Sequence, residues 1–438
     1  MNFLRGYENN VRALLICLTF AIPFGTKKFL YSFAPVVDEY HAIFLYGTDI
    51  LLLVSLVLFF FLGQRFYSIP PTIKKVSLAF WIFAVLSVVF ALTPWLAAYR
   101  VLRLGLYILL ALVAGTLIHR DQKFFRWICF SISASAIFQA FIGFSQFLYG
   151  KSVGLRLLGE SVINATTPNV GRMTLEGEKY LRAIGTMSHA NIFAAFLVIG
   201  LLCFFYLYLT SKGWGAKHIA LRIYSVLGIF AVCIGLIVSF SRSGWITASL
   251  VTLLVLVWGF FHKEYRRPTL GLLFVLLTTT YLLLTIFSWA IIPRAGFAPG
   301  EGSVNDRITY NKIGAELILK YPWGVGIGDQ ELTSVQEGLY QARGLTHDWL
   351  WQPVHNIYIL IASETGIQGI LAFLALLGLM LFRYGKNLLR GPEGAIALGM
   401  LAVSLLFGLV DHFPWDLPAG QLMLWLSVGL VLGITDNK

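Results

Sequence analysis

The stretch NIFAAFLVIGLLCFFYLYLT, residues 191–210, is twenty residues long and carries no charged side chain. A helix of this length spans about 30 Å, which is the thickness of the hydrocarbon core of a bilayer. Similar runs recur along almost all of the 438 residues, of which 58% are hydrophobic and 12% charged, with a mean hydropathy of +0.77. Because the runs are continuous rather than alternating, they predict membrane-spanning helices and not a barrel.

A window of about 19 residues, moved along the chain, predicts a bundle of about twelve transmembrane helices. The expected fold class is therefore an all-α integral membrane protein, with residues 1–438 forming a single transmembrane domain. The first apolar run has no small-residue cleavage site after it, so it is interpreted as a span and not as a removed signal. The predicted spans lie near residues 11–27, 42–62, 76–93, 99–118, 126–148, 188–210, 221–240, 245–261, 269–291, 355–381, 394–411 and 417–434.

Basic residues between the spans predict the topology. If the N-terminus is cytoplasmic, five short connections on that side carry three Lys or Arg residues each, and the short connections on the other face carry fewer. The positive-inside rule thus predicts that both termini are cytoplasmic and that two long loops, 149–187 and 292–354, lie on the outer side of the membrane. The net charge of +12 follows this scattered pattern and does not indicate nucleic-acid binding. The four cysteines lie within apolar runs without a CxxC pair, which argues against a disulfide framework or a zinc site.

The segment SFSRSGW, residues 239–245, joins two predicted spans and places Arg242 at the outer membrane–water boundary. An arginine at this depth could simply snorkel toward water. A short turn of small residues would also fix the depth of the guanidinium, whose planar fork matches phosphate oxygens. Arg242 is therefore a candidate for binding a diphosphate head group.

The second long loop contains SVNDRITYNKIGAELILKYPWGVGIG, residues 303–328. This segment predicts an amphipathic helix along the membrane surface, with Asn305 or Asp306 as its cap and its end before Pro322. Arg307 would then lie in the first turn, where the helix dipole disfavours a cation. Either Asp306 compensates for this charge, or a bound anion meets both Arg307 and the free amide groups of the helix end.

The segment PVHNIYILIASETG, residues 353–366, places His355 at the entrance of a predicted span, with Asn356 as the expected helix cap. A lone histidine at such an entrance is often only an interfacial residue. However, the helix dipole and partial burial both lower its pKa and favour a neutral imidazole, which can accept a proton. Since the topology places it on the same face as Arg242 and Arg307, His355 is the candidate general base for transferring a group from a diphosphate.

Three further residues are candidates for supporting roles. Arg100 and Arg103 share one helical face, so they would add positive charge to the same outer cavity or merely snorkel. Glu364 lies within a predicted span, where a charge is costly, and is expected to face the bundle interior and to pair with one of these arginines.

The segment DHFPWD, residues 411–416, offers Asp411 as another supporting residue. With His412 and Asp416 it forms an outward turn in which a metal site is conceivable. The ligand set is not convincing, and no metal is predicted there.

In GTMSHAN, residues 185–191, His189 is a second possible base. It follows the basic residues Lys179 and Arg182, and it ranks below His355.

Taken together, these segments resemble the O-antigen ligase superfamily. These polytopic glycosyltransferases include O-antigen ligases, some O-antigen and exopolysaccharide polymerases, and protein O-oligosaccharyltransferases. The resemblance covers the C-terminal two thirds of the chain, whereas the N-terminal third matches only in being a series of spans. The segments that carry it are RAIGTMSHANIFAAFL (182–197), SFSRSGW (239–245), NDRITYNKIGAELILKYPWGVGIG (305–328), HNIYILIASETGIQGILAFL (355–374) and DHFPWDLPAGQLMLWL (411–426).

The resemblance implies transfer of a glycan from undecaprenyl diphosphate to an acceptor hydroxyl, without a metal or other cofactor, at the periplasmic face of the bacterial inner membrane. For a ligase, the acceptor is a sugar of the lipid A core, and the process is lipopolysaccharide biosynthesis. The resemblance also implies that Arg242 and Arg307 bind the diphosphate and that His355 is the catalytic base of an inverting reaction. Residues 187–190 depart from the usual family sequence, so no catalytic role is carried over to them.

Two alternatives remain open at this stage. A polymerase would use the same donor but a second lipid-linked repeat as acceptor; a ligase is favoured because a long loop with one amphipathic helix is typical of that branch. A transporter or flippase of lipid-linked glycans would make no bond. The clustering of charges on one face, and the absence of obviously broken spans in the sequence, argue against a transporter.

Overall fold

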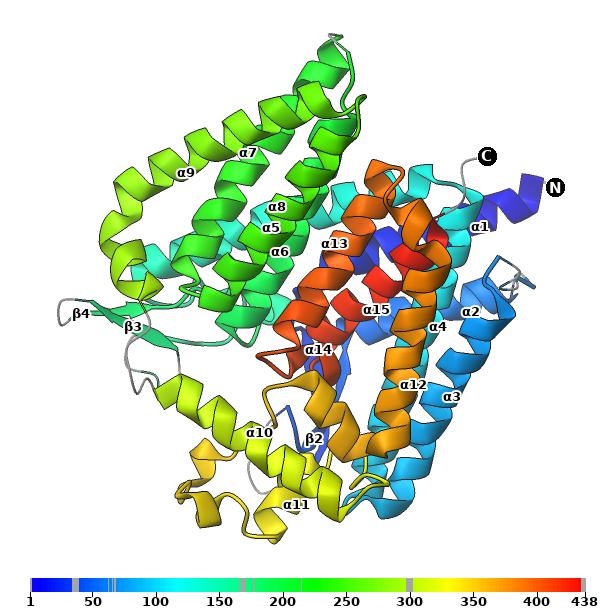
Figure 1. Cartoon of the computed structure of the whole chain (residues 1–438), viewed down its shortest axis with the longest axis vertical. Coiled ribbons are helices and arrows are strands. Elements are labelled where there is room, and N and C mark those ends of the chain that lie inside the picture. The colour runs from blue at the N-terminus through cyan, green and yellow to red at the C-terminus, as the bar shows by residue number, and fades with distance from the viewer. Residues whose placement is uncertain are drawn as a thin grey trace.

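The computed structural model describes residues 2–33, 39–61, 63, 64, 66, 68–164, 167, 171–175, 178–213, 215–296 and 302–434. Over these residues the chain is a bundle of long helices with small elements at one end (Figure 1). The helices of the bundle are α1 (Asn2–Ala21), α2 (Gly47–Phe61), α3 (Pro71–Ser87), α4 (Pro94–Arg120), α5 (Lys123–Tyr149), α6 (Ala190–Thr210), α7 (Ala216–Val238), α8 (Arg242–Phe261), α9 (Arg266–Ala295), α12 (Ile357–Leu388), α13 (Pro392–Phe407) and α15 (Pro418–Gly433).

Eight helices of the described part are long and apolar enough to cross a membrane: α4 to α9, α12, and α3 with its short 3₁₀ extension to Phe90. The chain is therefore a multi-pass membrane protein of the helical class. Three shorter apolar helices, α2, α13 and α15, have 15, 16 and 16 residues. Each of the predicted spans overlaps one helix, but the number of membrane crossings stays a prediction.

Proline begins several of these helices. Pro71, Pro94, Pro392 and Pro418 are the first residues of α3, α4, α13 and α15. The amide of the first helical residue has no acceptor within the helix, so a proline there costs no hydrogen bond. The proline ring also holds φ near its helical value. These four starts are thus encoded locally, before any packing.

Close helix packing depends on small residues, as is typical of helices in lipid. Between α4 and α15, a Cβ on Gly115 would lie 2.9 Å from the Cβ of Leu432, and one on Gly429 would lie 2.8 Å from the carbonyl oxygen of Ala111. Larger residues would force the two helices apart. The α6 helix lies inside the bundle, with 94% of its most apolar window buried.

Two antiparallel hairpins lie at the end of the bundle to which the loops 149–187 and 292–354 connect. Strands β1 (Lys27–Ser32) and β2 (Ala42–Tyr46) form the first hairpin, and β3 (Arg172–Leu175) and β4 (Glu178–Leu181) form the second. The predicted helical span 42–62 is wrong in its first turn, because residues 42–46 are a strand paired with β1. Alternating burial along β2 explains why its apolar residues mimic the start of a span.

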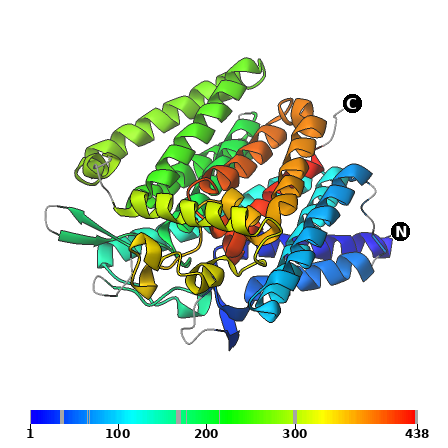
Figure 2. The same cartoon turned by 60° about the horizontal axis from the view of Figure 1, so that its bottom comes forward.

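The surface helix α10 (Gly302–Lys320) crosses the ends of other helices at one side of the bundle (Figures 1 and 2). It is amphipathic as predicted, since Ile313 and Leu317 are fully buried. Its close contact with the start of α12 requires a glycine: a Cβ on Gly314 would lie 2.6 Å from Cγ2 of Ile359 and 2.7 Å from Cγ2 of Val354.

The predicted start of α10 is wrong. The helix begins at Gly302, so Asn305 and Asp306 are not its caps, and Arg307 is the sixth residue. The dipole effect fades within the first turn. The expected conflict between Arg307 and the helix end is therefore absent, and the position of its side chain must be judged from its neighbours.

The α12 helix is broken inside the membrane-spanning stretch, although no broken span was expected from the sequence. Gly366 has φ +79°, a left-handed conformation that favours glycine. The loop before α11 (Gln330–Gln336) fills the break: the amide of Val325 donates to the carbonyl of Ser363 at 2.9 Å, and that of Gly326 to Glu364 at 3.0 Å. Backbone groups released at membrane depth are thus satisfied by protein.

Candidate active site

A cavity of about 570 Å³, here called the arginine cavity, lies at the end of the bundle that α10 crosses. Segments far apart in the sequence build it: the β1–β2 connection, the β3–β4 hairpin, the starts of α6, α8 and α12, the end of α9, α10, and the turn at the short helix α14 (Phe413–Asp416). Its charged and titratable lining consists of Arg172, Arg182, Arg242, Arg294, Arg307, His189, His355, His412, Glu39, Asp411 and Tyr40.

Four of the residues singled out in the sequence meet in this cavity. His355, Arg242, Arg307 and Asp411 all line it. His189, the second possible base, lines it as well. The predicted common face of the two arginines and the histidine is thus consistent with their positions in the fold.

His355 has a defined tautomer. Its Nδ1 lies 2.8 Å from the carbonyl oxygen of Pro353, and because a carbonyl can only accept, Nδ1 must carry the hydrogen. In the neutral ring, Nε2 then holds the lone pair. Asn356 caps α12, as predicted, by accepting from the amides of Tyr358 and Ile359 at 3.0 and 3.2 Å.

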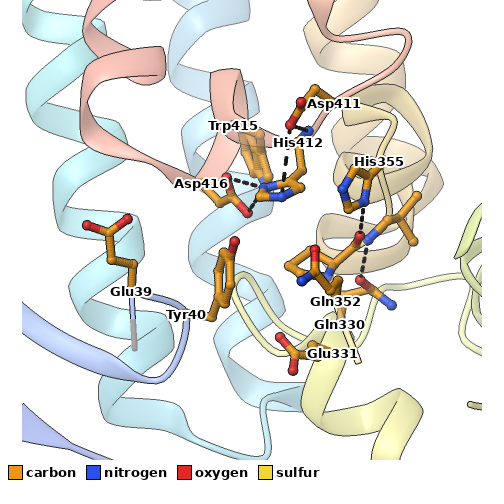
Figure 3. A network of polar contacts seen from close by, with 12 residues as sticks. Glu39, Tyr40, Gln330, Glu331, Gln352, His355, Asp411, His412, Trp415 and Asp416 are labelled. Atoms are coloured by element: carbon orange, nitrogen blue, oxygen red, sulfur yellow. Dashed lines mark hydrogen bonds and ion pairs between the residues drawn. The ribbon is translucent and has the colours of Figure 1, made fainter. Parts of the chain in front are cut away.

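The ring of His355 lies between two other rings. Tyr310 of α10 stacks on one side at 5.3 Å between centroids, and His412 meets it edge-on at 4.8 Å (Figure 3 shows the two histidines). Burial, together with the positive charges of His412 and Arg307, lowers the pKa of His355 to about 3. His355 is therefore neutral at physiological pH, with a free base at Nε2.

His412 has the opposite electrostatic character. Its Nδ1 donates to the Asp416 carboxylate at 2.8 Å, and its ring forms a T-shaped contact with the ring of Tyr40 at 5.6 Å between centroids (Figure 3). Burial would lower the pKa of His412, but the carboxylates of Asp416 and Asp411 overcome this effect and raise it to about 9. His412 is thus an imidazolium beside the neutral His355.

His355, Asp411 and His412 each offer one ligand atom, and these atoms lie within 4.8 Å of one another. This spacing alone could hold a metal ion. However, five arginines line the same cavity and repel a cation. No metal is therefore assigned to this cluster.

Asn191 connects three parts of the site. Its Nδ2 donates to Asp411 at 2.7 Å, and its Oδ1 accepts from Ser241 at 2.8 Å and from Arg182 at 3.3 Å. Ser241 is itself the cap of α8, accepting from the amide of Gly244 at 3.2 Å. Asn191 therefore fixes the start of α8, and with it Arg242, relative to Asp411.

His189 carries its hydrogen on the other nitrogen. Its Nδ1 accepts from the amide of Asn191 at 3.2 Å and caps α6. Burial and the nearby Arg182 lower its pKa to about 4. A neutral His189 with an acceptor at Nδ1 must bear the hydrogen on Nε2, so it presents a donor and not a base.

The arginines of the cavity are crowded together. Among the described residues, no carboxylate forms an ion pair with Arg172, Arg182 or Arg307. The Nε groups of Arg172 and Arg307 are buried without a hydrogen-bond partner. Burial and the charges of Arg294 and Arg307 lower the pKa of Arg182 to about 9. A bound anion would relieve this repulsion and satisfy the unpaired donors.

The structure places Arg100 and Arg103 outside the arginine cavity. Arg100 is buried and donates to the backbone carbonyls of Asp416, Glu39 and Tyr40 at 2.6, 2.9 and 3.1 Å. It thereby holds the β1–β2 connection against α14. Neither predicted role, added cavity charge or snorkelling, describes this contact.

Arg103 forms a buried ion pair with Asp49 at 3.1 Å. Glu364 faces the bundle interior as expected, but its hydrogen bonds come from Nε1 of Trp415 at 2.7 Å and from the backbone of Gly328, and not from either of the two arginines. Both residues hold helices together rather than line the site.

Sequence analysis gave no role to Arg172, Arg182, Arg294 or Asn191, and it considered His412 only for a metal site that it did not predict. All five residues line the cavity. One signal was present for the arginines. They lie in connections predicted to be periplasmic, where the positive-inside rule disfavours basic residues. For Asn191 no local pattern exists, because its partners Asp411 and Ser241 are distant in the sequence. For His412 a local signal was present, since its partner Asp416 lies four residues on in DHFPWD.

The fold and the cavity define a class: a multi-pass helical membrane protein with a cationic cavity that two neutral histidines line, one of them with a free Nε2 lone pair. Residues 227–374 match the family model described as O-Antigen ligase. This match confirms the resemblance to the O-antigen ligase superfamily and supports a glycosyltransferase-like function of the O-antigen ligase or polymerase type. The matched segment contains Arg242, Arg307 and His355. No curated protein matches the chain.

Proposed function

We propose that this protein transfers a glycan from undecaprenyl diphosphate to an acceptor hydroxyl at the periplasmic face of the inner membrane. As an O-antigen ligase, it would use a sugar of the lipid A core as the acceptor. One observation supports the proposal best: His355 and several arginines line the same cavity. The neutral His355 has its Nε2 available to a substrate, because Nδ1 is bonded to a carbonyl, and the arginines suit a diphosphate.

The chemistry follows from these positions. The acceptor oxygen attacks the anomeric carbon of the donor sugar while Nε2 of His355 takes its proton, and the bond from that carbon to the phosphate oxygen breaks. The electron pair leaves with the diphosphate, and the anomeric configuration inverts. Proton transfer to a placed base contributes about 10²- to 10⁴-fold to such rates.

Arg242 and Arg307 bind the diphosphate in this scheme. The departing diphosphate carries one more negative charge than the donor, so cationic groups around it bind the transition state more strongly than the ground state. The additional arginines of the cavity increase this preference. Asp411 and Asn191 keep the histidines and the start of α8 in place.

Reconstitution tests the function and separates its alternatives. The purified protein in liposomes would receive an undecaprenyl-diphosphate-linked glycan with either lipid A core or a second lipid-linked repeat. A ligase extends only the lipid A core. Extension of the lipid-linked repeat instead would indicate a polymerase, and movement of the lipid-linked glycan across the bilayer without a new bond would indicate a flippase.

A further inference from the structure

A second cavity, here called the α5–α7 cavity, lies at the other end of the bundle and has a volume of about 550 Å³. The first turns of α5 and α7 border it. The α7 helix has 23 residues and ends just before Arg242, so its start lies roughly 35 Å from the arginine cavity. The two cavities therefore belong to opposite membrane faces.

The rim of the α5–α7 cavity is basic. Lys123 and Arg126 lie on the first turn of α5, and Lys217 on the first turn of α7. Within the described part of the chain none of the three forms an ion pair, and no carboxylate lines the cavity. Asp121, two residues before Lys123, is already paired with Arg12 at 2.9 Å. The rim thus carries three positive charges with no counter-charge of its own.

Below the rim the walls are aromatic and aliphatic. Trp127, Phe130, Leu221 and Tyr224 line the cavity, and Ala220 leaves room between them. The Tyr224 hydroxyl is hydrogen-bonded at 3.0 Å to Ser133, a residue of α5 that does not line the cavity. The polar end of the Tyr224 side chain is therefore already satisfied by the protein. A ligand here must therefore be anionic at the water side and apolar one to two turns deeper.

We propose that the α5–α7 cavity binds one anionic phospholipid. Its phosphate lies among Lys123, Arg126 and Lys217, and an acyl chain follows the apolar wall. Basic pockets between helices on the cytoplasmic side are known to suit such head groups, whereas scattered basic residues attract them only loosely. The site is independent of the glycan transfer proposed above, because it shares no residue with the arginine cavity.

Native mass spectrometry of the full-length protein in detergent, titrated with phosphatidylglycerol or phosphatidylcholine, tests this proposal. The charge variant is the triple substitution Lys123→Gln, Arg126→Gln and Lys217→Gln. Its matched control removes three exposed basic residues at the same end of the bundle but outside the cavity: Lys75→Gln, Arg267→Gln and Arg383→Gln. The charge variant should lose at least about tenfold in affinity for phosphatidylglycerol, since each Lys or Arg near an anionic head group contributes about fivefold.

A second variant, here called the filling variant, tests whether lipid binding needs the cavity itself or only the basic charges around it. Ala220→Trp occupies the cavity without changing any charge, and should also reduce phosphatidylglycerol binding by about tenfold. Ile219→Trp, whose wild-type side chain is 42% exposed and lies outside the cavity, should leave it unchanged. Equal binding of phosphatidylglycerol and phosphatidylcholine by the wild type, or full binding by both the charge and the filling variants, would overturn the proposal.

Discussion

At the scale of single residues, the decisive feature is which nitrogen of each histidine is free. His355 donates from Nδ1 to a carbonyl, whereas His189 accepts at Nδ1 from an amide. The two rings line the same cavity and are both neutral, yet only His355 has a lone pair that no hydrogen bond of the described residues uses. Sequence analysis ranked His355 above His189 for other reasons, since no pattern in the sequence predicts a tautomer.

Replacing His189 should therefore be tolerated when its cap is kept. In His189→Asn the new side-chain oxygen can accept from the amide of Asn191, because asparagine is a preferred helix cap. We expect the transfer activity to stay within about tenfold of the wild type, because the substitution removes at most one hydrogen bond from Nε2 of His189 to the substrate. Initial rates in proteoliposomes provide the measurement; a loss as large as that of a His355 variant would assign the base to His189.

The pH dependence of kcat/KM should reflect the shifted pKa values in the free enzyme. His355 must be deprotonated to act, and its pKa is lowered to about 3, so its protonation should not reduce kcat/KM until the pH is far below 6.5. The positive charge of His412, whose pKa is raised to about 9, should be lost at the alkaline end.

His412→Asn provides the matched test of this interaction. Removing the adjacent imidazolium takes away one cause of the lowered pKa of His355, so the acid limb should move upward in pH. An acid limb already near 6.5 in the wild type, unchanged by the substitution, would contradict the interpretation.

At the scale of elements, the helix α10 is the part of the loop 292–354 that contacts His355. It carries both Arg307 and Tyr310, and Tyr310 stacks on His355. The existence of this helix could be predicted from its apolar spacing. Its start could not, because no capping side chain identifies Gly302 in the sequence.

Widening the contact between α10 and α12 should impair transfer without unfolding the bundle. Gly314→Leu would collide with Ile359 and Val354 and shift α10 away from His355. Because displacements of about 1 Å can cost 10²-fold in rate, we expect kcat/KM to fall by at least tenfold. Ala315→Leu, at an exposed neighbouring position, is the control; equal activity of the two variants would show that α10 does not position the site.

At the scale of the whole molecule, the apolar runs predict the helices well because a bilayer requires continuous apolar segments. The predictions fail where tertiary contacts decide the structure: the β1–β2 hairpin replaces the first turn of a span, and the break at Gly366 is stabilised by a loop some forty residues away. The clustering of Arg172, Arg182 and Arg294 also depends on the complete fold. Because Arg294 is distant from Arg172 and Arg182 in the sequence, no local segment shows that the three side chains line one cavity.

The predicted topology can be measured by labelling single cysteines in a variant in which Cys17 and Cys233 are serine. Leu157→Cys, at a position 90% exposed in the loop 149–187, should react with an impermeant thiol reagent in intact spheroplasts. Arg383→Cys, near the end of α12, should react only after permeabilisation. The reverse pattern would place the arginine cavity on the cytoplasmic side.

The central claim is that His355 performs proton transfer whereas the arginines bind the donor. Its most direct test measures transfer and donor affinity together in proteoliposomes containing His355→Ala, Arg242→Gln or Arg307→Gln. His355→Ala should lose at least about 10²-fold in transfer and keep donor affinity within about twofold, while each arginine variant should lose both. Normal transfer by His355→Ala, or unchanged donor affinity in both arginine variants, would contradict the account.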